Sequence, residues 1–236
     1  MIYVTGDIHG DLSVLRRRTR RLRRGDTLIV CGDFGFVFDD SPKEKRLLRR
    51  LGKRRYNTLF IDGVHDNLNL VTAYPEQEWC GGLTHVISGN LRHLCRGFIF
   101  TIEGMKILAF GGGEASALEQ SVIEWWDDLL PNIEQVNEAR ERLRQVGDEV
   151  DYIVTHRPSH KINLLLTGGE GEISLLDTFF DEVRGTCKHK GWFFGSLHMD
   201  KFIPPTQAAL FNEVIPLGGK IRFSNTNAAG RARKKK

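Results

Sequence analysis

The sequence predicts a mixed α/β domain. Apolar strand-like runs alternate with helical periodicity through the first 62 residues, and antiparallel signals appear in the middle of the chain. The chain has 236 residues, 40% of them hydrophobic, which suffices for one substantial core and is short for two independent domains. We therefore expect one domain over residues 1–224 and, over residues 225–236, a basic tail that is disordered.

Three apolar runs in the first 62 residues predict buried strands with a helix between each pair. The strands are expected at Ile2–Val4, Leu28–Val30 and Leu59–Ile61. The second helix has a clear start signal. Ser41 can cap it, Pro42 suits its first position, and Glu44 stands where a capping box needs an acidic residue.

The remainder of the chain predicts shorter strands and further helices. Strands are expected at 85–87, 98–102 and 106–110, the last two forming a hairpin around Glu103 and Gly104. Helical periodicity over about 133–146 and 175–183 is followed in each case by a strand, the first ending at His156 and the second near Gly195. A last strand is expected over about 208–217. This order of elements indicates a mixed α/β fold.

Five segments, far apart in the chain, place an Asp or a His directly after a predicted strand. They are Asp7 and His9 in TGDIHGD, Asp33 in CGDFG, His65 in IDGVHDN, His156 in IVTHR and His198 in FFGSLH. One such residue is commonly an ordinary loop residue, but five recurrences are improbable by chance. Strand ends are where α/β sheets bind ligands, and carboxylate with imidazole suits Mn, Fe or Zn. The sequence thus predicts a metal site.

This ordered set resembles the motifs of the calcineurin-like metallophosphoesterase superfamily, which run D-x-H, G-D-x-x-D, G-N-H-D/E, G/T-H and G-H-x-H. The resemblance extends over nearly the whole chain. FIDGxHxN, LxRG, ILAFGGG and WFFGxxH make the chain most similar to the small single-domain phage and bacterial members. The resemblance implies a four-layer α/β/β/α sandwich with two mixed β-sheets. It also implies metal-dependent hydrolysis of a phosphomonoester, phosphodiester or phosphoprotein through attack of a metal-bound hydroxide, as in a manganese-dependent phosphatase.

The same resemblance implies one complete metal position and one depleted position. The first-metal positions hold suitable donors: Asp7, His9, Asp33 and His198. The second metal keeps only the shared Asp33 and His156. Val64 replaces the Asn of G-N-H-D/E, and Ser196 replaces the first His of G-H-x-H. A divalent ion commonly needs three or four protein ligands, so we expect one bound ion and leave the second open.

His65 matches the catalytic His of the family. The resemblance implies that it is a general acid toward the leaving oxygen, which suits an imidazole that titrates near neutrality. The adjacent Asp66 is a candidate to orient the ring, although the second Asp of the motif G-D-x-x-D is absent here, since Phe36 stands in its place. The alternative is that His65 only orients a metal ligand.

Two other classes of function stay open. The changes at Val64 and Ser196 also fit a degenerate relative that binds a metal or a phosphorylated ligand without hydrolysing it. Two basic segments, Arg16–Arg24 and Arg231–Lys236, fit a protein that associates with nucleic acid, although a solvated surface or a solubilising end explains them equally well. The first segment is expected to be a helix whose arginines point into solvent while Leu15 and Leu22 pack.

Charge and cysteine content indicate the cellular environment of the protein. The last six residues carry five of the 34 Lys and Arg residues, so the remainder has 29 basic against 30 acidic residues. No apolar run reaches the ~20 residues of a membrane helix. The four cysteines, at positions 31, 80, 95 and 187, have no C-x-x-C spacing, and the chain begins on a strand rather than on a basic and apolar leader. We expect a cytoplasmic protein without disulfides and without membrane contact.

Overall fold

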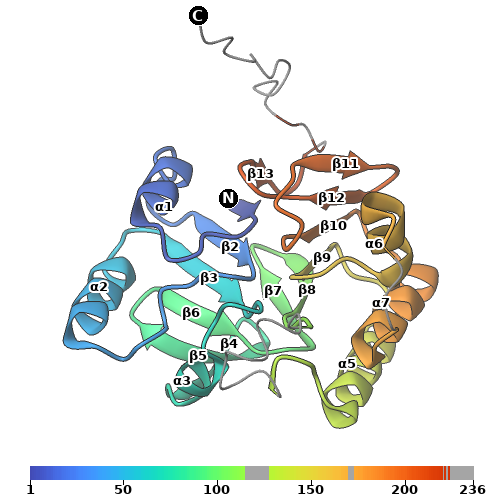
Figure 1. The fold of residues 1–236 in the computed structure, drawn as a ribbon, viewed down its shortest axis with the longest axis horizontal. Coiled ribbons are helices and arrows are strands. Elements are labelled where there is room, and N and C mark those ends of the chain that lie inside the picture. Colours follow the sequence, from blue (N-terminus) through green and yellow to red (C-terminus); the bar gives the residue numbers. More distant parts are fainter. Residues whose placement is uncertain (115–127, 170–172, 220, 222, 224–236) are drawn as a thin grey trace, which may run out of the picture.

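The computed structural model describes residues 1–114, 128–169, 173–219, 221 and 223. These residues form two mixed β-sheets packed face to face, with helices on the outer side of each sheet (Figure 1). The predicted four-layer α/β/β/α sandwich is therefore confirmed.

The first sheet contains the strands of the N-terminal half and one strand from the C-terminal end. In spatial order they are β13 (Val214–Pro216), β1 (Ile2–Thr5), β2 (Thr27–Cys31), β3 (Asn57–Ile61), β6 (Leu91–Leu94), β5 (Gly82–Ser88) and β4 (Glu76–Trp79). Strands β1, β2, β3 and β6 run parallel, and the others are antiparallel to their neighbours. The three predicted N-terminal strands thus lie side by side in the middle of this sheet.

The second sheet follows the same plan. Its strands, in order, are β11 (Lys201–Ile203), β12 (Gln207–Ala209), β10 (Gly191–Phe194), β9 (Tyr152–Thr155), β8 (Met105–Phe110) and β7 (Phe98–Ile102). Strands β12, β10, β9 and β8 run parallel. The predicted hairpin joins β7 to β8. Glu103 and Gly104 both have positive φ there, as a tight two-residue hairpin turn requires.

Helices cover the outer face of each sheet. The first sheet is covered by α1 (Leu12–Arg18), α2 (Pro42–Gly52) and α3 (Leu68–Thr72), and the second by α5 (Ile133–Gln145), α6 (His160–Thr167) and α7 (Leu175–Thr186). One hydrophobic cluster fills the space between the sheets, and two others lie between each sheet and its helices. Helix α2 begins as predicted, because the Ser41 hydroxyl accepts the Glu44 amide and Pro42 follows the cap.

The strand predicted over 208–217 was wrong as a single element. It is two short strands, β12 and β13, which belong to different sheets, so the chain crosses the sandwich between them. The Asp200 carboxylate accepts the amides of residues 211–213 and holds this crossing. Three short strands (β4, β6, β11) and two helices (α3, α6) were not predicted, because segments of three to eight residues carry little periodicity.

The first helix is shorter than its run of arginines. It ends at Arg18, and the Thr19 hydroxyl bonds back to the Leu15 carbonyl, so residues 20–24 lie beyond it. Leu15 and Leu22 are buried as expected.

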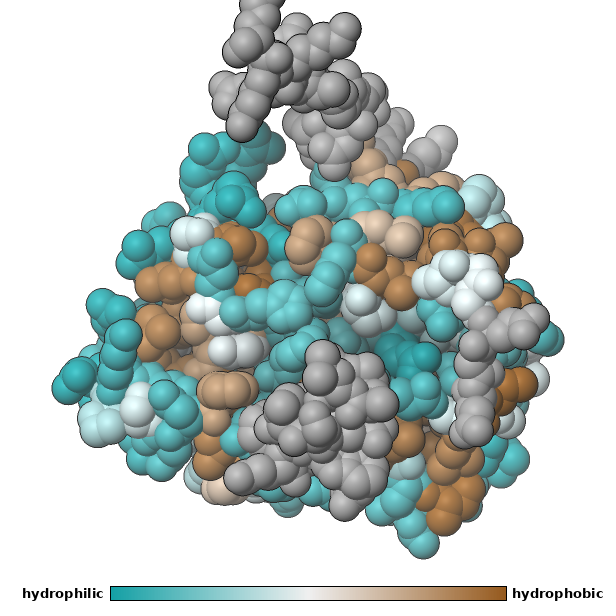
Figure 2. Space-filling view, in the orientation of Figure 1, coloured by the Kyte–Doolittle hydropathy of each residue, from teal (hydrophilic) through white to brown (hydrophobic). Residues whose placement is uncertain are grey.

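The segment 225–236 lies outside the described residues, and its disorder stays a prediction. None of the described helices combines the length and apolarity of a membrane span. Figure 2 shows hydrophilic residues gathered through the middle of one face.

Candidate metal centre

The ends of five strands bring the predicted Asp and His residues together. Strands β1, β2 and β3 of the first sheet and β9 and β10 of the second all end at the same edge of the sandwich. The loops that follow them carry the six residues singled out in the sequence: Asp7, His9, Asp33, His65, His156 and His198. The site is thus built across both sheets.

One group of donors surrounds Asp7. Its Oδ2 atom lies 3.1 Å from Nε2 of His198 and 3.8 Å from Nε2 of His9, and the two imidazole nitrogens are 2.9 Å apart. Asp7 Oδ2 is buried and has no hydrogen-bond partner among the described residues. Burial raises the pKa of Asp7. An unpartnered buried carboxylate oxygen facing two imidazole nitrogens is a setting that a divalent cation satisfies.

Asp33 lies between this group and the residues on its other side. Its Oδ2 atom is 2.8 Å from Nδ1 of His65 and 3.8 Å from Nδ1 of His9, and its Oδ1 atom is 3.7 Å from Nε2 of His156. Burial would raise the pKa of Asp33, but the charge of His156 and the hydrogen bond from His65 hold it well below its ordinary value. Asp33 therefore occupies the position expected of a shared ligand.

His156 is completely enclosed and has a fixed orientation. Its Nδ1 donates to the Cys31 carbonyl at 3.0 Å, which leaves Nε2 as the nitrogen that faces Asp33. Burial opposes a charged ring, yet the carboxylates of Asp33 and Asp7 raise the pKa of His156 above its ordinary value. The excess of negative charge at this point favours a bound cation.

The two departures from the family pattern lie where the second metal would need donors. Val64 is buried, and its Cγ2 and the Cδ2 of His156 both lie within 3.5 Å of the position that a Cβ on Gly113 would take. Val64 thus presents a methyl group beside His156. Ser196 donates its backbone amide to Asp7 Oδ1 at 3.2 Å.

Backbone strain is concentrated in the loops of the candidate metal centre. Four of the eight non-glycine residues that the structure describes with positive φ are His9, Asp33, Ser196 and His198. Each such conformation costs about 1–3 kcal/mol and persists only where the surrounding structure enforces it. Strain of this kind collects at functional sites, so the backbone identifies the same residues as the side chains.

Asp66 has a different role from the one predicted. We expected it to orient the ring of His65, but the contact to Nδ1 of that ring comes from Asp33. The Asp66 carboxylate instead accepts the backbone amides of Phe34, Gly35 and Gly63, which ties the loop after β2 to the loop after β3. Burial and the charge of Asp33 raise the pKa of Asp66 to about 7.

Arg18 is a site-supporting residue that the sequence analysis missed. Its guanidinium donates to the Gly6 carbonyl at 2.8 Å and to the Thr5 hydroxyl at 3.1 Å, directly before Asp7. We expected it to point into solvent, but it is buried, and burial lowers its pKa to about 10. The signal was its position three residues after Leu15 on the same helix, which places both on the buried stripe.

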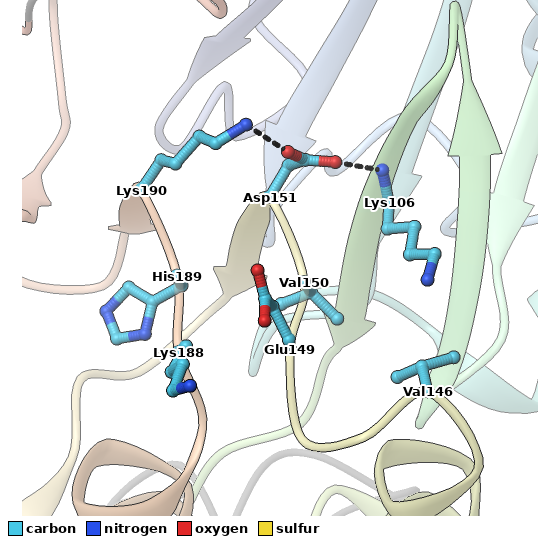
Figure 3. Close-up of a pocket in the computed structure, with 8 residues that line it drawn as sticks. All are labelled: Lys106, Val146, Glu149, Val150, Asp151, Lys188, His189 and Lys190. Carbon is cyan, nitrogen blue, oxygen red and sulfur yellow. Dashed lines mark hydrogen bonds and ion pairs between the residues drawn. The ribbon is translucent and has the colours of Figure 1, made fainter.

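Two hollows lie away from this centre. Arg17, Arg20 and Arg21 line one of about 730 Å³ beside α1. The other, of about 420 Å³, contains Asp151 between Lys190 and the Lys106 amide, at the opposite ends of β8, β9 and β10 (Figure 3). Neither belongs to the candidate centre. Nucleic-acid contact through Arg16–Arg24 stays a prediction, and Arg231–Lys236 lie outside the described residues.

Residues 1–210 match the family model described as calcineurin-like phosphoesterase. No curated protein matches the sequence. Among solved structures, the chain is similar to the protein of unknown function AQ665 from Aquifex aeolicus, with 17% identity, coverage of 68% of this chain and 81% of the other, and a TM-score of 0.35.

Gly195 provides a test of how closely the second sheet approaches Asp7. A Cβ at this position would lie 2.1 Å from Asp7 Oδ1 and 2.6 Å from the Cys31 carbonyl oxygen. Gly195→Ala should therefore displace the Asp7 carboxylate and weaken manganese binding by about 10- to 100-fold, measured by calorimetric titration. Gly185→Ala is the matched control, since a Cβ there meets nothing within 4 Å. Equal affinity in the two variants would contradict the placement of Asp7 in the centre.

Proposed function

The chain belongs to the calcineurin-like phosphoesterase family, and we propose that it is a metal-dependent phosphoesterase with one complete and one depleted metal position. The observation that carries the proposal is the gathering of carboxylate and imidazole donors from five strand ends, with His9 and His198 facing an unpartnered Asp7 oxygen and His65 and His156 facing Asp33. The substrate class is a phosphomonoester, phosphodiester or phosphoprotein.

The first metal would be held by Asp7, His9, Asp33 and His198, which together offer two carboxylates and two imidazoles. Manganese, iron and zinc all accept this donor set. A bound ion would supply Lewis acidity toward a phosphoryl oxygen and lower the pKa of a water molecule. Of the residues that the family pattern assigns to the second position, His156 and Asp33 keep their donors in the part of the chain that the structure describes, whereas Val64 has no donor atom.

His65 is the proposed proton donor. Its side chain is 45% exposed, so a substrate can reach it, whereas Asp33 is buried. With Nδ1 donating to Asp33, Nε2 is the nitrogen that can exchange a proton with the leaving oxygen. The backbone amide of His65 also donates to Asp33 Oδ1, so one carboxylate fixes both the loop and the ring.

A degenerate binding protein is the second candidate function. The observation that favours it is the buried Val64 side chain, which has no donor atom at the position where the family pattern has an Asn. The two candidates differ in turnover: both bind a divalent ion, but only the enzyme releases nitrophenolate from nitrophenyl mono- or diesters.

Asp33→Asn should reduce metal-dependent hydrolysis of a nitrophenyl ester by at least about 100-fold, because the shared carboxylate loses its charge. Asp148→Asn is a matched control, since Asp33 and Asp148 both have φ near +50° and Asn tolerates that conformation. The assay measures initial rates across a manganese titration. If the two variants retained the same rate, Asp33 would not be a ligand.

His65→Ala should slow hydrolysis of an alkyl phosphoester far more than that of a nitrophenyl ester, by about 100-fold against less than about 10-fold. The reason is that a poor leaving group needs a proton and nitrophenolate does not. Rates for both substrates, with His160→Ala as control, measure this difference. Equal losses on both substrates would mean that His65 only positions Asp33.

Val64→Asn combined with Ser196→His should raise bound metal by up to one ion per chain over the wild-type content and increase diester hydrolysis by roughly 10-fold, because two new donors join His156 and Asp33. The backbone of residue 196 has φ +57°, a conformation that His9 and His198 also adopt. Metal per chain is measured by elemental analysis after dialysis. Wild-type protein that already holds two ions at this centre would refute the depleted position.

A further inference from the structure

A second cluster of metal-ligand side chains lies on the outer face of the first sheet. Nδ1 of His85 is 3.1 Å from Nδ1 of His93 and 3.4 Å from Sγ of Cys95. All three residues are buried, and one donor atom from each lies within 4.8 Å of the others. None of them follows the five strand ends that form the centre described above.

The strands place these side chains together by register. His85 in β5 pairs directly with His93 in β6, and such a pair projects its side chains to one face. Cys95 follows His93 by two residues and remains paired, since its amide donates to the Leu83 carbonyl, so it shares that face. The cluster is therefore fixed by backbone hydrogen bonds rather than by a loop.

Both imidazoles have a carboxylate at the nitrogen that faces away from the cluster. Nε2 of His93 is 3.1 Å from Asp62, and Nε2 of His85 is 3.7 Å from Glu76. Asp62 is itself bound by the Arg96 guanidinium through two hydrogen bonds, so it is ionised and can only accept. His93 must donate from Nε2, and in the neutral ring this leaves a lone pair on Nδ1. A carboxylate at the second nitrogen is the usual support of a metal-ligating His.

Hydrogen bonds among the three side chains do not satisfy all three donor atoms of the cluster. A hydrogen on His85 Nδ1 lies in the ring plane and points in one direction, whereas the nitrogen has two close neighbours, the lone pair of His93 and the sulfur of Cys95. A cation at the centre satisfies all three donors at once. The distances agree with this: a tetrahedral zinc ion separates two nitrogens by about 3.3 Å and a nitrogen from a sulfur by about 3.6 Å.

We propose that His85, His93 and Cys95 form a zinc site separate from the phosphoesterase centre. Two imidazoles and a thiolate form a donor set that binds zinc in preference to magnesium, calcium or manganese. The three residues line a cavity of about 270 Å³ together with Leu68 of α3 and Glu138 of α5. Solvent in this cavity provides the fourth ligand, as in zinc sites with three protein ligands.

Cobalt substitution tests the proposal, because the thiolate gives a near-ultraviolet sulfur-to-cobalt charge-transfer band that Asp and His ligands do not produce. Wild-type protein loaded with Co²⁺ should show this band, and Cys95→Ser should lose it. Cys80→Ser is the matched control, since Cys80 is a free cysteine outside the cluster, and it should keep the band. Zinc measured by elemental analysis should fall by one equivalent per chain in Cys95→Ser.

Two further measurements separate this site from the phosphoesterase centre and test whether the variants are folded. Asp7→Asn with His198→Gln removes donors from the phosphoesterase centre and should keep the band, which separates this site from that one. Circular dichroism checks that each variant is folded. Absence of the band in wild-type protein saturated with cobalt would overturn the proposal whatever the variants do, as would a band that survives in Cys95→Ser. In either case the cluster holds only protons.

Discussion

The carboxylate of Asp33 is the contact on which the arrangement of the site depends. It follows β2, in the middle of the first sheet, and reaches His9 from β1, His65 from β3 and His156 from the opposite sheet. Because one oxygen also accepts the amide of His65, the carboxylate fixes the loop after β3 as well as the His65 ring. A buried charge with so many partners is stable only if all of them are present, so these loops hold one another in place.

The strained loops need support from residues outside the donor set. Asp66 binds amides of the loops after β2 and β3, and Arg18 holds the carbonyl that precedes Asp7. Gly32 lets the second sheet approach, because a Cβ there would lie 2.1 Å from Nδ1 of His156. About 1–3 kcal/mol of strain per positive-φ residue is thus offset by hydrogen bonds that involve buried charges.

The sequence was sufficient for the layers of the fold and for the group of residues that converge, but not for their supports. Apolar runs followed by Asp or His place residues such as His156 and His198 at strand ends, and parallel strands bring those ends to one edge. The crossing between β12 and β13 could not be predicted, since it depends on Asp200 bonding backbone amides that carry no sequence signal. Likewise, Asp66 and Arg18 act on the backbone, so residue type alone suggests other roles. The identity of the metal ligands stays a prediction.

The end of β3 connects the two clusters. Asp62 and His65 are three residues apart, and the first contacts His93 while the second contacts Asp33. The Asp62 backbone carbonyl accepts the Gly112 amide, and its carboxylate packs where a Cβ on Gly111 would lie 2.2 Å away, so this segment has little room to shift. This four-residue segment therefore presents the Asp62 carboxylate to one cluster and the His65 imidazole to the other. The two clusters are thus adjacent because both take a residue from one closely packed strand end.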